Sequence, residues 1–273
     1  MAEQKMYFAA RHLGVKLDQD RHWCAKGSGT PLLALCDGIG EYPGSGAVAE
    51  LMIDMVSERM PRSHKEWNEC VVAARDMVLE KRLEGGTTLL SCYAEEEALD
   101  ASDRLIIHHL GNGAVLHLAG DFHDLGPSQA PYKVNHVVMP HVNGQGALAR
   151  HVSHGSGAEE LRLSEQVLRL NQPAGDIVLM VTDGITTLEE EMLIKHMEAG
   201  YLRVQSEALQ YVLGRLHSLL QVNCVSLAFG EVLEQFTGEV LLGLKEEQLL
   251  DDDAALGLVV TQRVLDHYAK MVS

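Results

Sequence analysis

The chain has 273 residues, with 39 acidic against 22 basic side chains and a formal net charge of −17. Such an excess of negative charge repels nucleic acids and anionic lipids, so we expect neither a nucleic acid nor a membrane as partner. No apolar run approaches the roughly 18 residues of a membrane span. The first residues also lack the basic segment and apolar core of a signal peptide, and we therefore expect a cytoplasmic protein.

The N-terminal part of the chain predicts two strands followed by two helices. Apolar runs predict strands over Lys5 to Ala10 and Pro31 to Cys36. Apolar residues at helical spacing predict an amphipathic helix from Ser45 to Met60. A second helical pattern runs from Trp67 to Val78 and stops near Gly85-Gly86.

Strand-like segments follow, and we expect them to form an antiparallel meander. The segments are Thr87 to Tyr93, Arg104 to Leu110 and Ala114 to Leu118. The sequence Gly111-Asn112-Gly113 predicts a tight turn between the last two of them. The stretch from Gly120 to Leu161 is rich in Gly, Pro, His and Ser, which predicts loop around one strand at Val134 to Met139.

The C-terminal part mixes buried strands with longer helices. Strands are predicted over Ile177 to Val181 and Leu256 to Val260; helices are predicted over Leu188 to Met197, Gln205 to Leu220 and Arg263 to Met271. Grouped strands without a regular βαβ alternation predict an α+β sandwich. No repeat or linker divides the chain, so we expect a single domain over residues 1–273.

Two apolar strands end in the same dipeptide, at Asp37-Gly38 and at Asp183-Gly184. The first does not open a dinucleotide loop, because the third glycine of that motif would fall on Pro43. Two further acidic stretches, Gln19-Asp20 and Asp251-Asp252-Asp253, also lie beside predicted strands. Carboxylates gathered at one end of a sandwich can hold two divalent cations, which prefer oxygen ligands.

The order of these motifs resembles that of the metal-dependent protein phosphatases, also called type 2C phosphatases. The matching segments are Asp18-Gln19-Asp20, Asp37-Gly38-Ile39-Gly40 with the helix start Gly46-Ala47-Val48-Ala49, Gly86-Thr87-Thr88, Gly111-Asn112-Gly113-Ala114, Pro173 to Gly184, and Asp252-Asp253-Ala254-Ala255. The resemblance covers roughly Leu13 to Val260. Within it, Asn223 to Leu250 matches no motif of the family, so residues 222–250 form a candidate insert or partner surface.

The resemblance implies a four-layer α-β-β-α sandwich, in which helices flank two antiparallel sheets, and the activity of a serine/threonine protein phosphatase. Two Mn²⁺ or Mg²⁺ ions would be held by the carbonyl of Gly38 and by the carboxylates of Asp20, Asp37, Asp183 and Asp252. A water shared by the ions would attack phosphoserine or phosphothreonine, so Asp37 and Asp183 would act through that water. The implied partners are a phosphoprotein substrate and a cognate serine/threonine kinase.

Four positions depart from the family pattern. Asn112 stands where the family has an aspartate of a third metal site, and Ile39 where many eukaryotic members have a histidine thought to be the general acid. Ala255 replaces a threonine. The phosphate-binding arginine is missing, and Lys16 is the nearest candidate for its role. Asn112, Ala255 and the missing arginine favour a second hypothesis, a phosphatase-fold protein with weak or no catalysis that binds a phosphoprotein or regulates a kinase.

Two other interpretations fit the sequence less well. Asp183-Gly184-Ile185-Thr186 resembles the haloacid dehalogenase phosphatases, whose nucleophilic aspartate would fall on Val181. A zinc site could use adjacent histidines, but His108 and His109 point to opposite faces of a strand. The histidine pair at positions 151 and 154 has no helical context. Neither pair predicts a zinc site.

Overall fold

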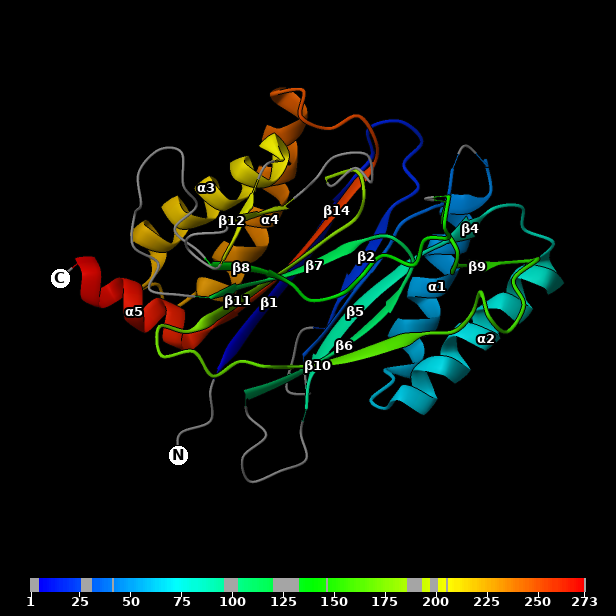
Figure 1. Ribbon diagram of the computed structural model, residues 1–273, viewed down its shortest axis with the longest axis horizontal. Helices are drawn as coiled ribbons and strands as arrows, with labels where there is room; N and C mark the ends of the chain where they lie inside the picture. Colours follow the sequence, from blue (N-terminus) through cyan, green and yellow to red (C-terminus); the bar gives the residue numbers. More distant parts are fainter. Residues whose placement is uncertain are drawn as a thin grey trace.

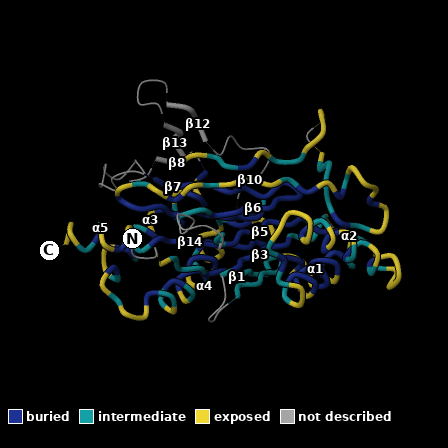
Figure 2. The backbone as a smooth tube through the Cα atoms, turned by 90° about the horizontal axis from the view of Figure 1, so that it is seen from below, coloured by how far each residue is buried: buried dark blue, intermediate teal, exposed yellow. Residues whose placement is uncertain are grey.

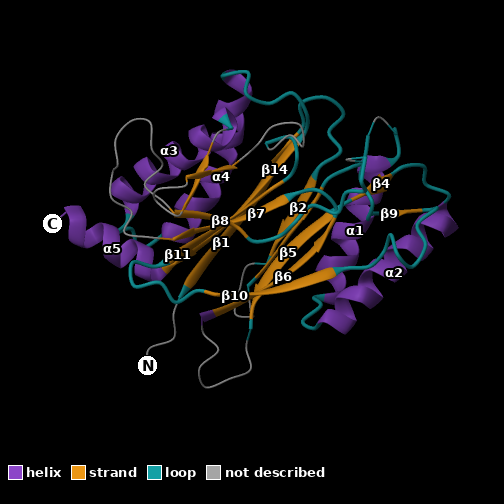
Figure 3. Cartoon of the chain, in the orientation of Figure 1, coloured by secondary structure: helices purple, strands orange, loops and turns teal. Residues whose placement is uncertain are grey.

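The structure is a computed structural model that describes residues 5–25, 31–40, 42–95, 103–119, 133–145, 147–185, 193–196, 201–204 and 206–272. Within these residues, two antiparallel sheets lie between two groups of helices (Figure 1, Figure 3). The expected α+β sandwich, with helices on both outer sides, is confirmed. None of the helices in the described part of the chain is both long and apolar enough to span a membrane.

The larger sheet has seven strands in the order β1-β14-β11-β7-β8-β13-β12. They are β1 (Met6–Leu13), β14 (Ala254–Thr261), β11 (Asp176–Val181), β7 (Ala114–Ala119), β8 (Lys133–His136), β13 (Tyr201–Val204) and β12 (Leu193–His196). The smaller sheet has the order β10-β6-β5-β3-β2. It contains β10 (Ser164–Arg169), β6 (Arg104–Leu110), β5 (Leu89–Ala94), β3 (Leu32–Cys36) and β2 (Arg21–Cys24). A short ribbon pairs β4 (Gly86–Thr87) with β9 (Val152–Ser153).

Helices cover the outer face of each sheet. The helices α1 (Ser45–Arg59) and α2 (His64–Lys81) share one hydrophobic cluster with the five-stranded sheet. A second cluster joins the seven-stranded sheet to α3 (Glu207–Asn223), α4 (Phe229–Glu246) and α5 (Gln262–Val272). A third fills the space between the sheets, and the buried segments lie along the central strands in Figure 2. Strands such as β3 and β11 are buried on both faces, which explains their continuous apolar runs.

The predicted meander is only half right. The strands β5 and β6 pair antiparallel as expected, but β6 and β7 lie in different sheets. The turn at Gly111-Asn112-Gly113 therefore carries the chain from one sheet to the other, with Gly111 at a φ of 122°. The two strands do not pair because each already has two neighbours in its own sheet. This crossing places Asn112 at the end of the sandwich, where the acidic strand ends also lie.

Several elements differ from the sequence prediction. The predicted helix Leu188 to Met197 is wrong over Leu193–His196, which is strand β12, because pairing with β13 overrides local helical spacing; its other residues lie outside the described ones. The edge strand β10 was missed because its side chains are mostly exposed and give no apolar pattern. In the region of the candidate insert, α4 buries one face against the seven-stranded sheet.

Candidate functional site

A cleft with a volume of about 660 Å³ collects the residues singled out in the sequence. Four carboxylates come to it from four places: Asp20 just before β2, Asp37 just after β3, Asp183 just after β11 and Asp252 just before β14. The cleft is also lined by Lys16, Gly38 and Asn112. The tertiary structure thus brings together all seven candidate residues, although they are spread over most of the chain.

The loop after β3 is fixed by the Gly86-Thr87-Thr88 segment. The carbonyl oxygen of Asp37 accepts hydrogen bonds from the Thr88 amide and the Thr87 hydroxyl, both at 2.9 Å. The backbone around Gly38 passes so close to the N-terminal loop that a Cβ there would lie 2.6 Å from that of Gln19. These contacts hold the main chain of Asp37 and leave its carboxylate to line the cleft.

Asp20 is connected by hydrogen bonds to the ends of two other strands. Asp20 is 1% exposed, and its Oδ2 accepts a hydrogen bond of 2.8 Å from the Thr182 hydroxyl. That hydroxyl oxygen in turn accepts one of 2.7 Å from the Ala255 amide. The side chain of Ala255 lies in the core between the sheets, so the alanine at this position takes no group away from the cleft lining.

The structure separates the roles of two neighbouring aspartates. Asp253 is buried, and its two carboxylate oxygens accept hydrogen bonds from the amides of Val15, Lys16 and Gln19 at 2.7–2.8 Å. Burial by itself raises the pKa of Asp253, but these amide hydrogen bonds outweigh it and lower the pKa overall. By contrast, the side chain of Asp252 is 55% exposed and lies 3.5 Å from the Lys16 amine. Asp253 is therefore a scaffold, and Asp252 is the acid available to a ligand.

Burial and mutual repulsion disfavour the ionised form of the buried acids in the cleft. Burial raises the pKa of Asp20 to about 7. Burial also raises the pKa of Asp37 well above its usual range, and the neighbouring charges of Asp183 and Asp20 raise it further. The pKa of Asp183 is raised by burial against the opposing effect of a hydrogen bond from Asn112. A bound cation would remove this repulsion, because it favours the ionised carboxylates.

Two further observations describe the side-chain oxygens available to a cation in the cleft. Asn112 donates a hydrogen bond of 2.7 Å from Nδ2 to Asp183, while its Oδ1 is buried and has no partner among the described residues. No three of the cleft acids bring ligand atoms within 4.8 Å of one another. The cleft acids therefore do not form a ready three-ligand site for a single ion.

The basic residues near the cleft are occupied in different ways. The Lys16 side chain is 57% exposed at the cleft rim, beside Asp252. Arg21 follows the first acid, but its Nη1 donates to the carbonyl oxygens of Asp18 and Asp20, and its guanidinium pairs with Glu50. It braces the loop from outside the cleft lining. Lys16 is therefore the one basic side chain among the residues that line the cleft in the described structure.

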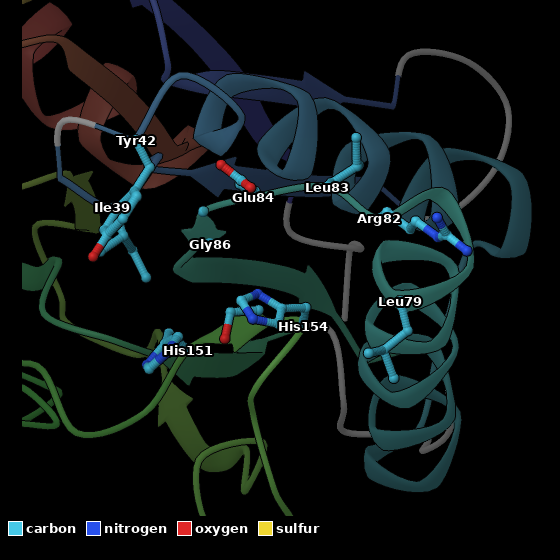
Figure 4. A pocket seen from close by; sticks show the side chains of 11 residues that line it. Ile39, Tyr42, Leu79, Arg82, Leu83, Glu84, Gly86, His151 and His154 are labelled. Carbon is cyan, nitrogen blue, oxygen red and sulfur yellow. The ribbon is translucent and has the colours of Figure 1, made fainter.

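A second cavity, of about 560 Å³, adjoins the cleft, and Ile39 lines both. Figure 4 shows Ile39 and Tyr42 on one side of it, and Leu79 and Arg82 at the end of α2 on the other. His151 and its neighbours from β9 complete the wall. This cavity could not be predicted from the sequence, because its walls come from three separate segments.

No protein-family model matches the chain, and no curated protein sequence is significantly similar to it. Solved structures are similar. The serine/threonine phosphatase PstP/Ppp of Mycobacterium tuberculosis has 13% identity and a TM-score of 0.55, over 93% of this chain and 98% of that chain. The serine/threonine phosphatase of S. agalactiae has 14% identity and a TM-score of 0.59, over 93% and 99%. PppA, described as a key regulatory component of T6SS in Pseudomonas aeruginosa, has 15% identity and a TM-score of 0.59, over 94% and 100%.

At these identities the similarity concerns the fold. This chain has the fold of the type 2C serine/threonine phosphatases, as its sequence motifs indicated.

Proposed function

We propose that this protein is a metal-dependent phosphatase that hydrolyses phosphoserine and phosphothreonine in a protein substrate. The observation that carries the proposal is the convergence of Asp20, Asp37, Asp183 and Asp252 on one cleft, in a fold shared with bacterial serine/threonine phosphatases. These four carboxylates, with the carbonyl of Gly38, would hold two Mn²⁺ or Mg²⁺ ions. Four negative charges balance two divalent ions, which accounts for a cluster that is otherwise costly to bury.

The side chains of the cleft have distinct roles in this proposal. Bound there, the two ions would supply Lewis acidity and lower the pKa of a water molecule that attacks phosphorus. Thr182 orients Asp20, and Asn112 orients Asp183. Lys16 offers a positive charge to the phosphoryl oxygens of the substrate. Ile39 has no titratable group, so the departing side-chain oxygen would take its proton from water.

The cavity beside the cleft supports a protein substrate. It adjoins the acids through Ile39 and offers both apolar and polar walls. Residues that flank the phosphorylated side chain could bind there, while the phosphate itself lies among the carboxylate-bound ions. Under this proposal the partners are a phosphoprotein and the serine/threonine kinase that modifies it, and we expect them in the cytoplasm.

A second candidate function is that of a phosphatase-fold protein that binds the metal ions but does not hydrolyse a substrate. It is favoured by Asn112, which already donates a neutral amide hydrogen bond to Asp183 where the family pattern has a carboxylate. It is also favoured by the lack of an arginine among the residues that line the cleft in the described part of the chain. Such a protein would bind a phosphoprotein, or regulate a kinase, without hydrolysing the phosphate.

The test uses metal-stripped protein with p-nitrophenyl phosphate and a phosphothreonine peptide, before and after addition of Mn²⁺ or Mg²⁺. We expect metal-dependent hydrolysis that Asp37→Asn and Asp183→Asn abolish. Asp18→Asn is the matched control, because Asp18 is an exposed neighbour outside the cleft lining, and it should leave the rate unchanged. Mn²⁺ binding without hydrolysis would favour the second candidate, whereas no binding of Mn²⁺ or Mg²⁺ would refute both.

A further inference from the structure

Away from the acid cleft, three side chains from separate segments meet at the edge of the five-stranded sheet. His64 is the first residue of α2, His108 lies on β6 and Glu165 lies on β10. His108 and Glu165 are directly opposite each other in the antiparallel pair β6–β10, so their side chains stand on the same face of the sheet. His64 reaches them from the N-terminus of the helix that covers this face. None of the three lines the acid cleft.

We propose that His64, His108 and Glu165 bind one transition-metal ion of the zinc class. Glu165 Oε2 lies 3.0 Å from His108 Nε2 and 3.7 Å from His64 Nδ1. One ligand atom from each of the three residues lies within 4.8 Å of the other two, and this is the one such group of His, Cys, Asp or Glu found in the described part of the chain. Tetrahedral zinc, with ligands at about 2.0–2.2 Å, holds neighbouring ligand atoms roughly 3.3–3.6 Å apart.

The adjustment that binding requires falls on exposed side chains. The His64 ring stacks on the His108 ring with centroids 5.5 Å apart and an interplanar angle of 16°, so it has to turn before both rings direct a nitrogen at one ion. The side chains of His64 and Glu165 are 44% and 36% exposed, so both can move toward an ion, and an ion can reach them. The His108 ring is completely buried and stacks against Trp67 and Tyr93, with ring centroids 5.2 and 6.0 Å away. One ligand is thus held rigidly while the other two adapt.

The chemistry of the group distinguishes it from the acid cleft. Two imidazoles and one carboxylate suit zinc and similar ions, whereas Mg²⁺ and Mn²⁺ prefer oxygen ligands. Burial lowers the pKa of His108 to about 3, so its ring is neutral at physiological pH, and the neutral ring is the form of histidine that binds a metal ion. Three protein ligands leave a fourth position for water or for a partner's side chain. The ion would join the start of α2 to the edge strand β10.

Zinc binding to the full-length chain tests the proposal without any measurement of hydrolysis. The metal-stripped protein is placed in excess Mg²⁺, so that the acid cleft is saturated with an ion that imidazoles bind poorly. Calorimetric titration with Zn²⁺ should then show one equivalent bound by the wild type. His64→Ala and Glu165→Gln should each weaken this binding by about 10- to 100-fold or more, since even outer partners of a metal site have effects of this size.

His154→Ala is the matched control, because His154 is an exposed histidine outside the cluster. It should bind zinc as the wild type does, and zinc should raise the melting temperature of the wild type and His154→Ala but not of His64→Ala. Equal binding by the wild type and His64→Ala would overturn the proposal. Zinc binding that is seen without Mg²⁺ but abolished by excess Mg²⁺ would also overturn the proposal, because such zinc would be bound in the acid cleft.

Discussion

The substitution Asp253→Asn tests whether this acid is a scaffold of the cleft and not a ligand within it. The carboxylate of Asp253 receives three main-chain amides from the loop that leads to Asp20. Asparagine has one acceptor oxygen, which can still serve the amides of Val15 and Lys16. Its NH₂ group would then face the amide of Gln19, a donor against a donor.

The expected destabilisation can be worked out from these contacts. A buried amide left without a partner costs about 1–3 kcal/mol, and a hydrogen bond to a neutral acceptor is weaker than one to a charged acceptor by about 1 kcal/mol. One lost and two weakened bonds at Asp253 therefore lower the free energy of unfolding by about 4 kcal/mol. This is a large part of the roughly 5–15 kcal/mol that stabilises a typical domain.

Urea denaturation of metal-free protein, compared with the matched variant Asp252→Asn, checks this prediction. Asp252 is half exposed and paired with an exposed lysine, so its substitution should change stability by no more than about 0.5 kcal/mol. It should instead weaken Mn²⁺ binding. Equal losses of stability in the two variants would refute the assignment of roles, and so would an Asp253→Asn variant as stable as the wild type.

Other predictions concern glycines and protonation. A Cβ at Gly184 would lie 1.9 Å from the Asp253 carbonyl oxygen, so Gly184→Ala should lower the free energy of unfolding by about 3 kcal/mol or more in urea melts. Gly214, exposed in α3 with open space around it, is the opposite case, and Gly214→Ala should raise this free energy by about 0.5–1 kcal/mol; a loss there would contradict the geometry. Folding raises the pKa of Asp20 to about 7 and also raises the pKa of Asp37. Above about pH 4, the folded metal-free protein therefore binds more protons than the unfolded chain. Its stability should therefore fall as pH rises from about 5 to 8, and saturating Mn²⁺ should flatten this slope; an unchanged slope with Mn²⁺ would argue against metal at these acids.

The sequence alone was sufficient to predict that acidic residues stand at the ends of two buried strands. Asp37-Gly38 and Asp183-Gly184 each follow an apolar strand that is buried on both faces, and such strands are visible as continuous apolar runs. The glycine after each acid is also visible in the sequence, but the need for it is tertiary, because a Cβ at Gly38 would meet Gln19 and one at Gly184 would meet the Asp253 carbonyl oxygen. The predicted α+β sandwich followed from the same runs, together with the helical spacing of Ser45 to Met60.

Tertiary structure decided everything that depends on which segments become neighbours. The resemblance pointed to Asp252 as the ligand, but the role of Asp253 was not visible, since only the amides of a loop more than 200 residues away make it a scaffold. Local spacing also joined β6 and β7 in one meander, whereas the strands pair within different sheets. The histidines of the chain were judged by their sequence neighbours, but His108 meets His64 and Glu165 through sheet register and helix docking. Secondary-structure propensity and hydrophobic periodicity are properties of a few consecutive residues. They therefore do not reveal which distant segments pair with each other.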